Sequence, residues 1–127
     1  RQIAWRVSRY ADVITVLSEA IVRNSNAVTQ EAGSLLNMVR SRAGISTYNL
    51  SDIKGVDDFL EKVLEERGHE LWFEGARRTD LIRHGKYIEY ARKYRGSVTA
   101  QDYMNLMPLP QSIINESKGT VIQNPGY

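Results

Sequence analysis

Apolar residues recur at spacings of three and four along the first third of the chain. Over residues 5–23 they share one stripe of a helical wheel, and the same spacing returns over residues 32–43. The turn-forming segment 23–26 separates the two stretches, and Gly44 follows the second as a helix C-cap. The pattern therefore predicts an antiparallel hairpin of two helices. Its stripe residues are Val7, Tyr10, Ala11, Ile14, Leu17, Ile21, Ala32, Leu35, Leu36, Val39 and Ala43.

A third and longer helix is predicted after a connecting loop over residues 44–55, in which isolated apolar residues can fold back on the core. Asp57 or Asp58 can cap this helix, because acidic residues are favoured at helix N-termini. Its apolar face is expected to run on through Trp72. The face consists of Phe59, Leu60, Val63, Leu64, Leu71 and Trp72.

In the remainder of the chain the helical spacing of apolar residues is less regular. Residues 76–84 and 86–95 favour two short helices that end at Gly85 and Gly96. Prolines cannot sit in a helix interior, so Pro108 and Pro110 predict an extended tail, packed on the helices over residues 97–127.

The patterns together predict an all-α fold with tetratricopeptide-like helical hairpins over residues 1–96 and an irregular, proline-containing tail. A length of 127 residues suits a single domain, 1–127. Negligible sheet is expected. The residues predicted to be buried are Leu17, Ile21, Leu35, Leu36, Val39, Leu60, Leu64 and Trp72.

Composition excludes several kinds of chemistry. The chain has no cysteine, which rules out disulfides, thiolate metal sites and cysteine nucleophiles. His69-Glu70 resembles the start of a zinc-protease motif, but Phe73 stands where the second histidine belongs. His84 lies near Arg83 and Lys86, whose charges disfavour a bound cation. No catalytic residue, metal site or cofactor is predicted.

Charge is distributed in two blocks. Residues 57–74 contain seven acids and two bases, whereas residues 75–95 contain seven bases and two acids. The basic block can form a face that binds phosphate or an acidic partner. The favoured interpretation is that the two blocks pack together and neutralise each other, and the equal negative block argues against a nucleic-acid partner.

Four tyrosines are candidates for stacking on a sugar ring or a base. Tyr87, Tyr90 and Tyr94 fall on one helical stripe, and Tyr48 lies in the predicted loop. Ordinary amphipathic packing explains such a stripe more often. They remain weak glycan-binding candidates, with packing as the favoured alternative.

Five segments, in order, resemble the C-terminal region of the SusD/RagB family. They are residues 9–13, 37–44 and 65–81, then Leu106-Met107-Pro108-Leu109-Pro110 and the closing Gln123-Asn124-Pro125-Gly126-Tyr127. The resemblance implies an outer-membrane lipoprotein of Bacteroidetes-type bacteria that captures glycans or other nutrients at the cell surface. Its implied partner is a TonB-dependent transporter barrel similar to SusC, and it is not an enzyme.

Family members are several times longer than this chain, so the resemblance implies a C-terminal fragment whose lipid anchor lies upstream. The sugar-contacting residues of the family also lie mostly upstream, so no ligand residue is carried over. We therefore expect the fragment alone to bind oligosaccharides poorly. The alternatives are a stand-alone helical adaptor for a protein partner and, third, a basic nucleic-acid module.

One cluster within the resembling segments has a physical interpretation of its own. Glu70, Glu74 and Arg77 share a helical face if the helix continues through residue 75, and Arg78 and Asp80 follow at once. We predict a structural charge network of these five residues. A catalytic carboxylate pair is disfavoured, because the arginines would keep the acids ionised.

Overall fold

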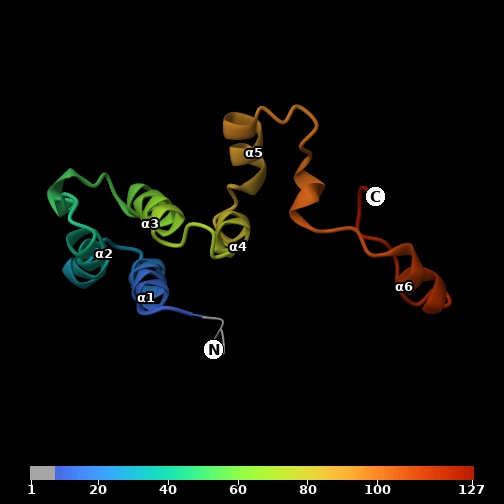
Figure 1. The fold of residues 1–127 in the computed structure, drawn as a ribbon, viewed down its shortest axis with the longest axis horizontal. Helices are drawn as coiled ribbons and strands as arrows, with labels where there is room; N and C mark the ends of the chain where they lie inside the picture. Colours follow the sequence, from blue (N-terminus) through green and yellow to red (C-terminus); the bar gives the residue numbers. More distant parts are fainter. Residues whose placement is uncertain (1–7) are drawn as a thin grey trace, which may run out of the picture. The chain divides into compact units, whose positions relative to one another are not determined.

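The computed structural model describes residues 8–127, and every regular element in that range is helical. This confirms the all-α prediction; Val7 of the first predicted stripe lies outside the described residues. The elements, labelled in Figure 1, are α1 (Tyr10–Ser25), α2 (Gln30–Arg42), α3 (Val56–Glu70), α4 (Ala76–Arg83), α5 (Tyr87–Arg95) and α6 (Gln111–Glu116), with 3-10 turns at Leu50–Asp52 and Asp102–Asn105.

The chain divides into two compact units, one ending at Arg77 and the other running from Arg78 to Tyr127. Unit one holds α1, α2 and α3, and unit two holds α5, α6 and the second 3-10 turn. The division falls within α4, after its second residue. The prediction that they form a single domain stays a prediction.

The hairpin of α1 and α2 is shaped by its caps. The Thr29 side chain accepts a hydrogen bond from the backbone N–H of Ala32 at 3.1 Å and so begins α2. Gly44 has a φ of 73°, a left-handed conformation that only glycine adopts at little cost. The N–H of Ile45 can then bond to the carbonyl of Arg40. The predicted end of this helix is confirmed.

The core of unit one is formed where α1, α2 and α3 meet. Its largest buried cluster consists of Val22, Ala32, Leu36, Phe59, Leu60 and Val63, and a smaller one of Ala11, Ile14 and Val39. Among the residues predicted to be buried, Leu36, Val39, Leu60 and Leu64 are buried, and Ile21 and Leu35 are half-buried.

The prediction was wrong for Leu17, which is 46% exposed. Helix α1 carries apolar residues on two sides, and the side that faces the core includes the small polar residues Thr15 and Ser18. Ser18 is fully buried and donates a hydrogen bond to the carbonyl of Ala32 at 2.8 Å. Because the Ser18 hydroxyl has a hydrogen-bond partner there, Ser18 can be buried, and the side of α1 that carries Leu17 faces away from the core.

The prediction was also wrong for Trp72, which is 73% exposed. Helix α3 ends at Glu70, so the helical spacing no longer governs the direction of later side chains. Phe73 follows with a φ of 64°, which is unusual for an aromatic residue, and the chain then turns at Gly75. Phe73 is 92% exposed, so the turn between α3 and α4 presents two large aromatic side chains to solvent.

The predicted extended tail is corrected by helix α6. Pro110 stands at the N-cap of α6 with a φ of −56°, so the proline precedes this helix and does not interrupt it. Hydrogen bonds join the two ends of the tail, on either side of α6. The Gln123 side-chain amide accepts from the N–H of Leu109 at 2.7 Å and donates to its carbonyl at 3.0 Å. The Tyr127 hydroxyl donates to the carbonyl of Leu106 at 2.9 Å.

Gly126 is required for this closure, and we expect Gly126→Ala to open the tail. Its φ is 97°, and a Cβ added there would lie 2.4 Å from Cγ of the Tyr103 ring. Tyr103 would have to leave its edge-to-face contact with Tyr127, whose ring centroid lies 4.9 Å away. Limited proteolysis should cut the variant faster within residues 106–127, with cutting of unit one unchanged. Equal cutting rates in the tail of variant and wild type would contradict this account.

Candidate functional site

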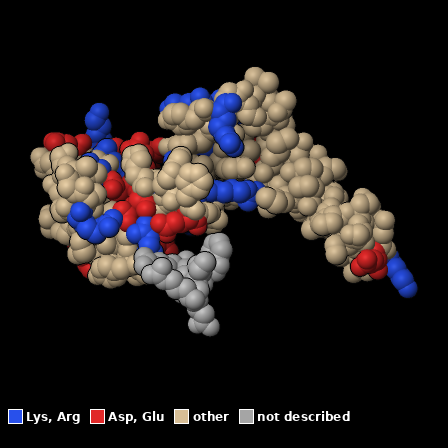
Figure 2. Space-filling model, viewed as in Figure 1, with Lys and Arg blue, Asp and Glu red and all other residues tan. Residues whose placement is uncertain are grey.

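Helix α3 presents a row of carboxylates that are reached by Arg9, at the N-cap of α1, and by two arginines of α2. Glu66, with 3% of its side chain exposed, pairs with Arg40 at 2.6 Å. One turn later Glu70, 9% exposed, pairs with Arg9 at 2.8 Å and also with Arg42. The pairs therefore bind three helices together at a spacing of one turn. Over the region of α1 to α3, at the left of Figure 2, acidic and basic side chains lie next to one another.

Arg67 makes the reverse connection, from α3 to α1. Its Nη1 lies 2.8 Å from the Asp12 carboxylate and donates to the Thr15 hydroxyl at 2.8 Å. Only 5% of its side chain is exposed. A guanidinium so well enclosed and bonded has a structural role, because binding an external ligand would require these contacts to break.

The five residues of the predicted charge network are found in four settings. Arg9 joins Glu70 and Glu74, the latter at 2.7 Å, and hydrogen bonds to Glu74 and Glu70 raise the pKa of Arg9 above its ordinary value. Arg77 donates to the carbonyl of Leu64 at 2.6 Å.

The other two members lie in unit two. Arg78 donates to the carbonyl of Asn105 at 3.3 Å, and its guanidinium lies 5.1 Å from the centroid of the Tyr87 ring. Asp80, which is buried, pairs with Arg83 at 2.9 Å. That the five act as one network stays a prediction. The sequence analysis missed Arg9, because 61 residues separate it from Glu70 and no local spacing reveals the pairing.

Many residues of the two charge blocks pair within their own unit, whereas the sequence analysis expected the blocks to pair with each other. Glu66 and Glu70 of α3 pair with Arg9 and with arginines of α2, as described above. In the basic block, Arg83 pairs with Asp80, Lys86 with Glu89, and Arg92 with Asp102. These contacts lie within unit two, so part of the neutralisation takes place inside each unit.

Tyr48 lies in the loop between α2 and α3. The Arg40 guanidinium stands 4.0 Å from the centroid of its ring, and the Asn37 side chain bonds to both its backbone N–H and its carbonyl. Burial raises the pKa of Tyr48 above its ordinary value. Ring and backbone are thus both engaged in holding the loop, which favours the packing interpretation for this residue.

The tyrosine stripe lies on α5. The rings of Tyr90 and Tyr94 are 4.9 Å apart, and Lys93 lies 4.9 Å from the Tyr94 ring. Tyr94 is 63% exposed, whereas Tyr87 and Tyr90 are half-buried. Tyr94 therefore has the most accessible ring of the stripe, and sugar stacking by any of the four tyrosines stays a prediction.

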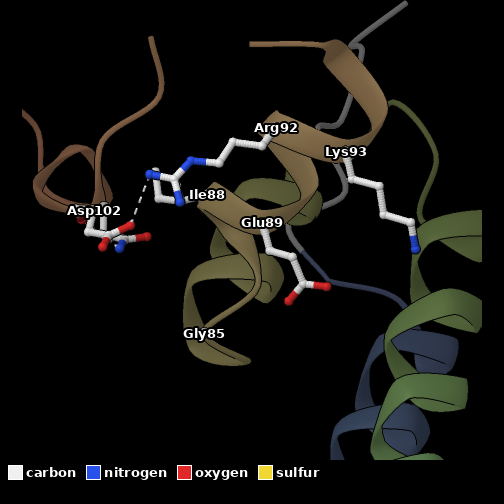
Figure 3. A pocket seen from close by; sticks show the side chains of 7 residues that line it. Gly85, Ile88, Glu89, Arg92, Lys93 and Asp102 are labelled. Atoms are coloured by element: carbon white, nitrogen blue, oxygen red, sulfur yellow. Dashed lines mark hydrogen bonds and ion pairs between the residues drawn. The ribbon is translucent and has the colours of Figure 1, made fainter. Parts of the chain in front are cut away.

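An open hollow lies in unit two between α5 and the 3-10 turn Asp102–Asn105 (Figure 3). Its volume is about 640 Å³, within the range of small-molecule sites. Sequence reasoning missed it, because it arises only when residues 100–105 fold back on α5. The lining residues are Gly85, Ile88, Glu89, Arg92, Lys93, Asp102 and Asn105.

The residues that the structure describes contain no group of three or more histidines and acids that could hold a metal ion. Over the same range, no helix combines the length and the apolar character needed to cross a bilayer. The side chains around the hollow can both donate and accept hydrogen bonds.

Comparison with known proteins assigns the fold to a family. The sequence model of the SusD family matches residues 1–127. The starch-binding protein SusD of Bacteroides thetaiotaomicron is 28% identical over 120 residues, an alignment that covers 87% of this chain and 20% of that protein. The chain thus spans one fifth of the length of that curated relative.

Two solved structures of SusD-type proteins also resemble this chain in fold. A SusD homologue from Bacteroides thetaiotaomicron matches with a TM-score of 0.76 and 28% identity, and a SusD superfamily protein from Parabacteroides distasonis with 0.73 and 25%. Each match covers 97% of this chain and 27% of the other. The resemblance found in five sequence segments is therefore confirmed by a match along the whole chain and by the arrangement of its helices: the chain belongs to the SusD family.

Proposed function

We propose that this chain is the scaffold part of a cell-surface glycan-binding lipoprotein that works with a TonB-dependent outer-membrane transporter. Family membership and the starch-binding relative support the glycan-binding role. The polar groups of unit one support a scaffold rather than an enzyme, because its buried charges are paired with one another across helices.

The observation that carries the scaffold proposal is a second apolar face on α1. Tyr10, Val13 and Leu17 follow one another at spacings of three and four, and they are 71%, 53% and 46% exposed. Trp72 and Phe73 add two exposed aromatic rings in edge-to-face contact, with centroids 5.4 Å apart. Exposed apolar surface of this kind is typical of an interface.

We infer that further helices of a longer SusD-type protein cover this face. The chain spans a fifth of its curated relative, and stacked helical hairpins bury both sides of their inner helices. Ligand contacts would then come largely from segments outside this chain.

The proposal predicts that the 127-residue chain binds glycans weakly. In calorimetric titrations with a panel of neutral and acidic oligosaccharides, we expect no dissociation constant near the micromolar range. The longer protein encoded by the same reading frame serves as the control and should bind at least one of them tightly. Micromolar binding by the chain alone would show that the principal site lies within it and would contradict the scaffold role.

The same apolar face also fits the second candidate function, a stand-alone helical adaptor for a protein partner. The reading frame upstream of Arg1 separates the two. A long coding stretch that begins with a lipoprotein signal supports the scaffold, and an initiator codon directly upstream supports the adaptor. Co-purification of the longer protein with a TonB-dependent transporter would test the proposed partnership.

A further inference from the structure

The hollow beside α5 has an apolar floor and a polar rim. Ile88 forms the floor and is only 6% exposed, whereas the side chains of Glu89 and Asp102 are 52% and 88% exposed. Figure 3 shows Arg92 reaching from α5 toward Asp102 while Glu89 leaves the same helix in another direction. A ligand resting on Ile88 would therefore meet polar groups on more than one side.

The rim is held in place by contacts within unit two. Arg92 donates from Nε and Nη2 to the carbonyl of Ala100, at 3.0 and 2.8 Å, and its Nη2 lies 3.3 Å from Oδ1 of Asp102. The Asn105 amide donates to the backbone carbonyl of Asp102 at 2.8 Å. Arg92, which is held by several of these bonds, loses little conformational freedom when a ligand binds.

These internal bonds leave hydrogen-bonding atoms of both kinds at the rim. Among the described residues, Arg92 Nη1 remains as a donor, and Oδ2 of Asp102, Oε1 of Glu89 and Oδ1 of Asn105 remain as acceptors. Hydroxyl groups, which donate and accept at once, match such a mixed set, and the charged members form the stronger bonds.

The balance of charge selects the class of ligand. Two cations, Arg92 and Lys93, and two anions, Glu89 and Asp102, line the hollow. Both anions are already paired, Glu89 with Lys86 and Asp102 with Arg92, so the lining does not strongly favour a charged ligand of either sign. The polar rim is unsuited to a purely apolar molecule. A neutral molecule with several hydroxyl groups and one apolar face, which is the character of a pyranose ring, fits best.

We propose that this hollow is a binding site for a neutral saccharide, with Arg92, Asp102, Glu89 and Asn105 bonding to hydroxyls and Ile88 contacting the C–H face of the ring. The inference rests on the proposed glycan-binding function and places one weak site within this chain. It is separate from the predicted stacking of a sugar on Tyr94, which does not line the hollow.

The test is a titration of the ¹⁵N-labelled 127-residue chain with maltoheptaose, followed through backbone amide shifts. We expect saturable shifts confined to residues 85–93 and 100–105, with affinity in the millimolar range. Asp102→Ala and Asn105→Ala should each weaken binding about three- to ten-fold, as expected for the loss of one or two hydrogen bonds. Glu116→Ala, an exposed acid of α6, is the matched control and should leave the affinity unchanged.

Other outcomes distinguish failure of the proposed site in the hollow from failure of the proposed glycan-binding function. If Tyr94→Ala abolishes the shifts and Asp102→Ala does not, the hollow is not the binding site, but the proposed glycan-binding function still stands. Tighter binding of a galacturonate oligosaccharide than of maltoheptaose would overturn the neutral ligand class. Absence of shifts at millimolar saccharide would overturn the inference, and failure of the longer protein to bind any glycan would overturn the proposed function as well.

Discussion

Replacing Arg40 with methionine is expected to lower the free energy of unfolding by about 3 to 5 kcal/mol. Glu66, its partner, has only 3% of its side chain exposed, so the substitution leaves a buried carboxylate without its ion pair. The variant also loses the hydrogen bond from Arg40 to the carbonyl of Ser46, at 2.7 Å, and the contact with the Tyr48 ring. Urea unfolding followed by far-ultraviolet circular dichroism measures the loss.

Arg42→Met is the matched control for this variant. Arg42 lies on the same helix and also pairs with a carboxylate of α3, but 62% of its side chain is exposed. Solvent-exposed pairs contribute about 0 to 1 kcal/mol, so a small change is expected. The double variant Arg40→Met with Glu66→Leu should regain most of the stability, because no buried charge is left unpaired. Equal effects of Arg40→Met and Arg42→Met would show that burial of Glu66 is not the cause.

Phe59→Ala is expected to destabilise the chain by a similar amount, about 3 to 5 kcal/mol. The Phe59 side chain is fully buried in the main cluster of unit one, beside Val22, Leu36 and Val63. Removing its ring leaves a cavity that neighbours on three different helices cannot easily fill. The midpoint of urea unfolding should fall accordingly.

The chain's other phenylalanine provides the control, because Phe73 is 92% exposed. Phe73→Ala should change the stability of the 127-residue chain by no more than about 0.5 kcal/mol. In the longer protein, where we propose that this ring is covered, the same change should be clearly destabilising. A large loss in the chain alone would mean that Phe73 packs within it.

Local features of the fold could be predicted from the sequence because neighbouring residues determine them. The ends of α2, α4 and α5 were all marked by a following glycine, at Gly44, Gly85 and Gly96. The spacing of apolar residues likewise located the first three helices. Such signals depend on a few consecutive residues, which the sequence displays directly.

Features that depend on distant residues could not be predicted. Ser18 of α1 faces the core, where its hydroxyl donates a hydrogen bond to a carbonyl of α2. The more apolar Leu17 is exposed. Arg9 finds its carboxylates more than sixty residues away. The hollow in unit two depends on a return of the chain at Ala100 that no periodicity reveals.

The long separation between α1 and α3 also bears on how unit one is assembled. Arg67 lies 52 residues after Thr15, so their contact closes a long stretch of chain, with an entropy cost that short-range contacts do not carry. Helices and the α1–α2 hairpin depend on local contacts, so we expect them to form first and the docking of α3 to be the slower step. During synthesis from the N-terminus, Asp12 and Thr15 leave the ribosome well before Arg67 exists. Unit one therefore becomes stable only once α3 has emerged, and until then the hairpin exposes the apolar side that α3 will cover.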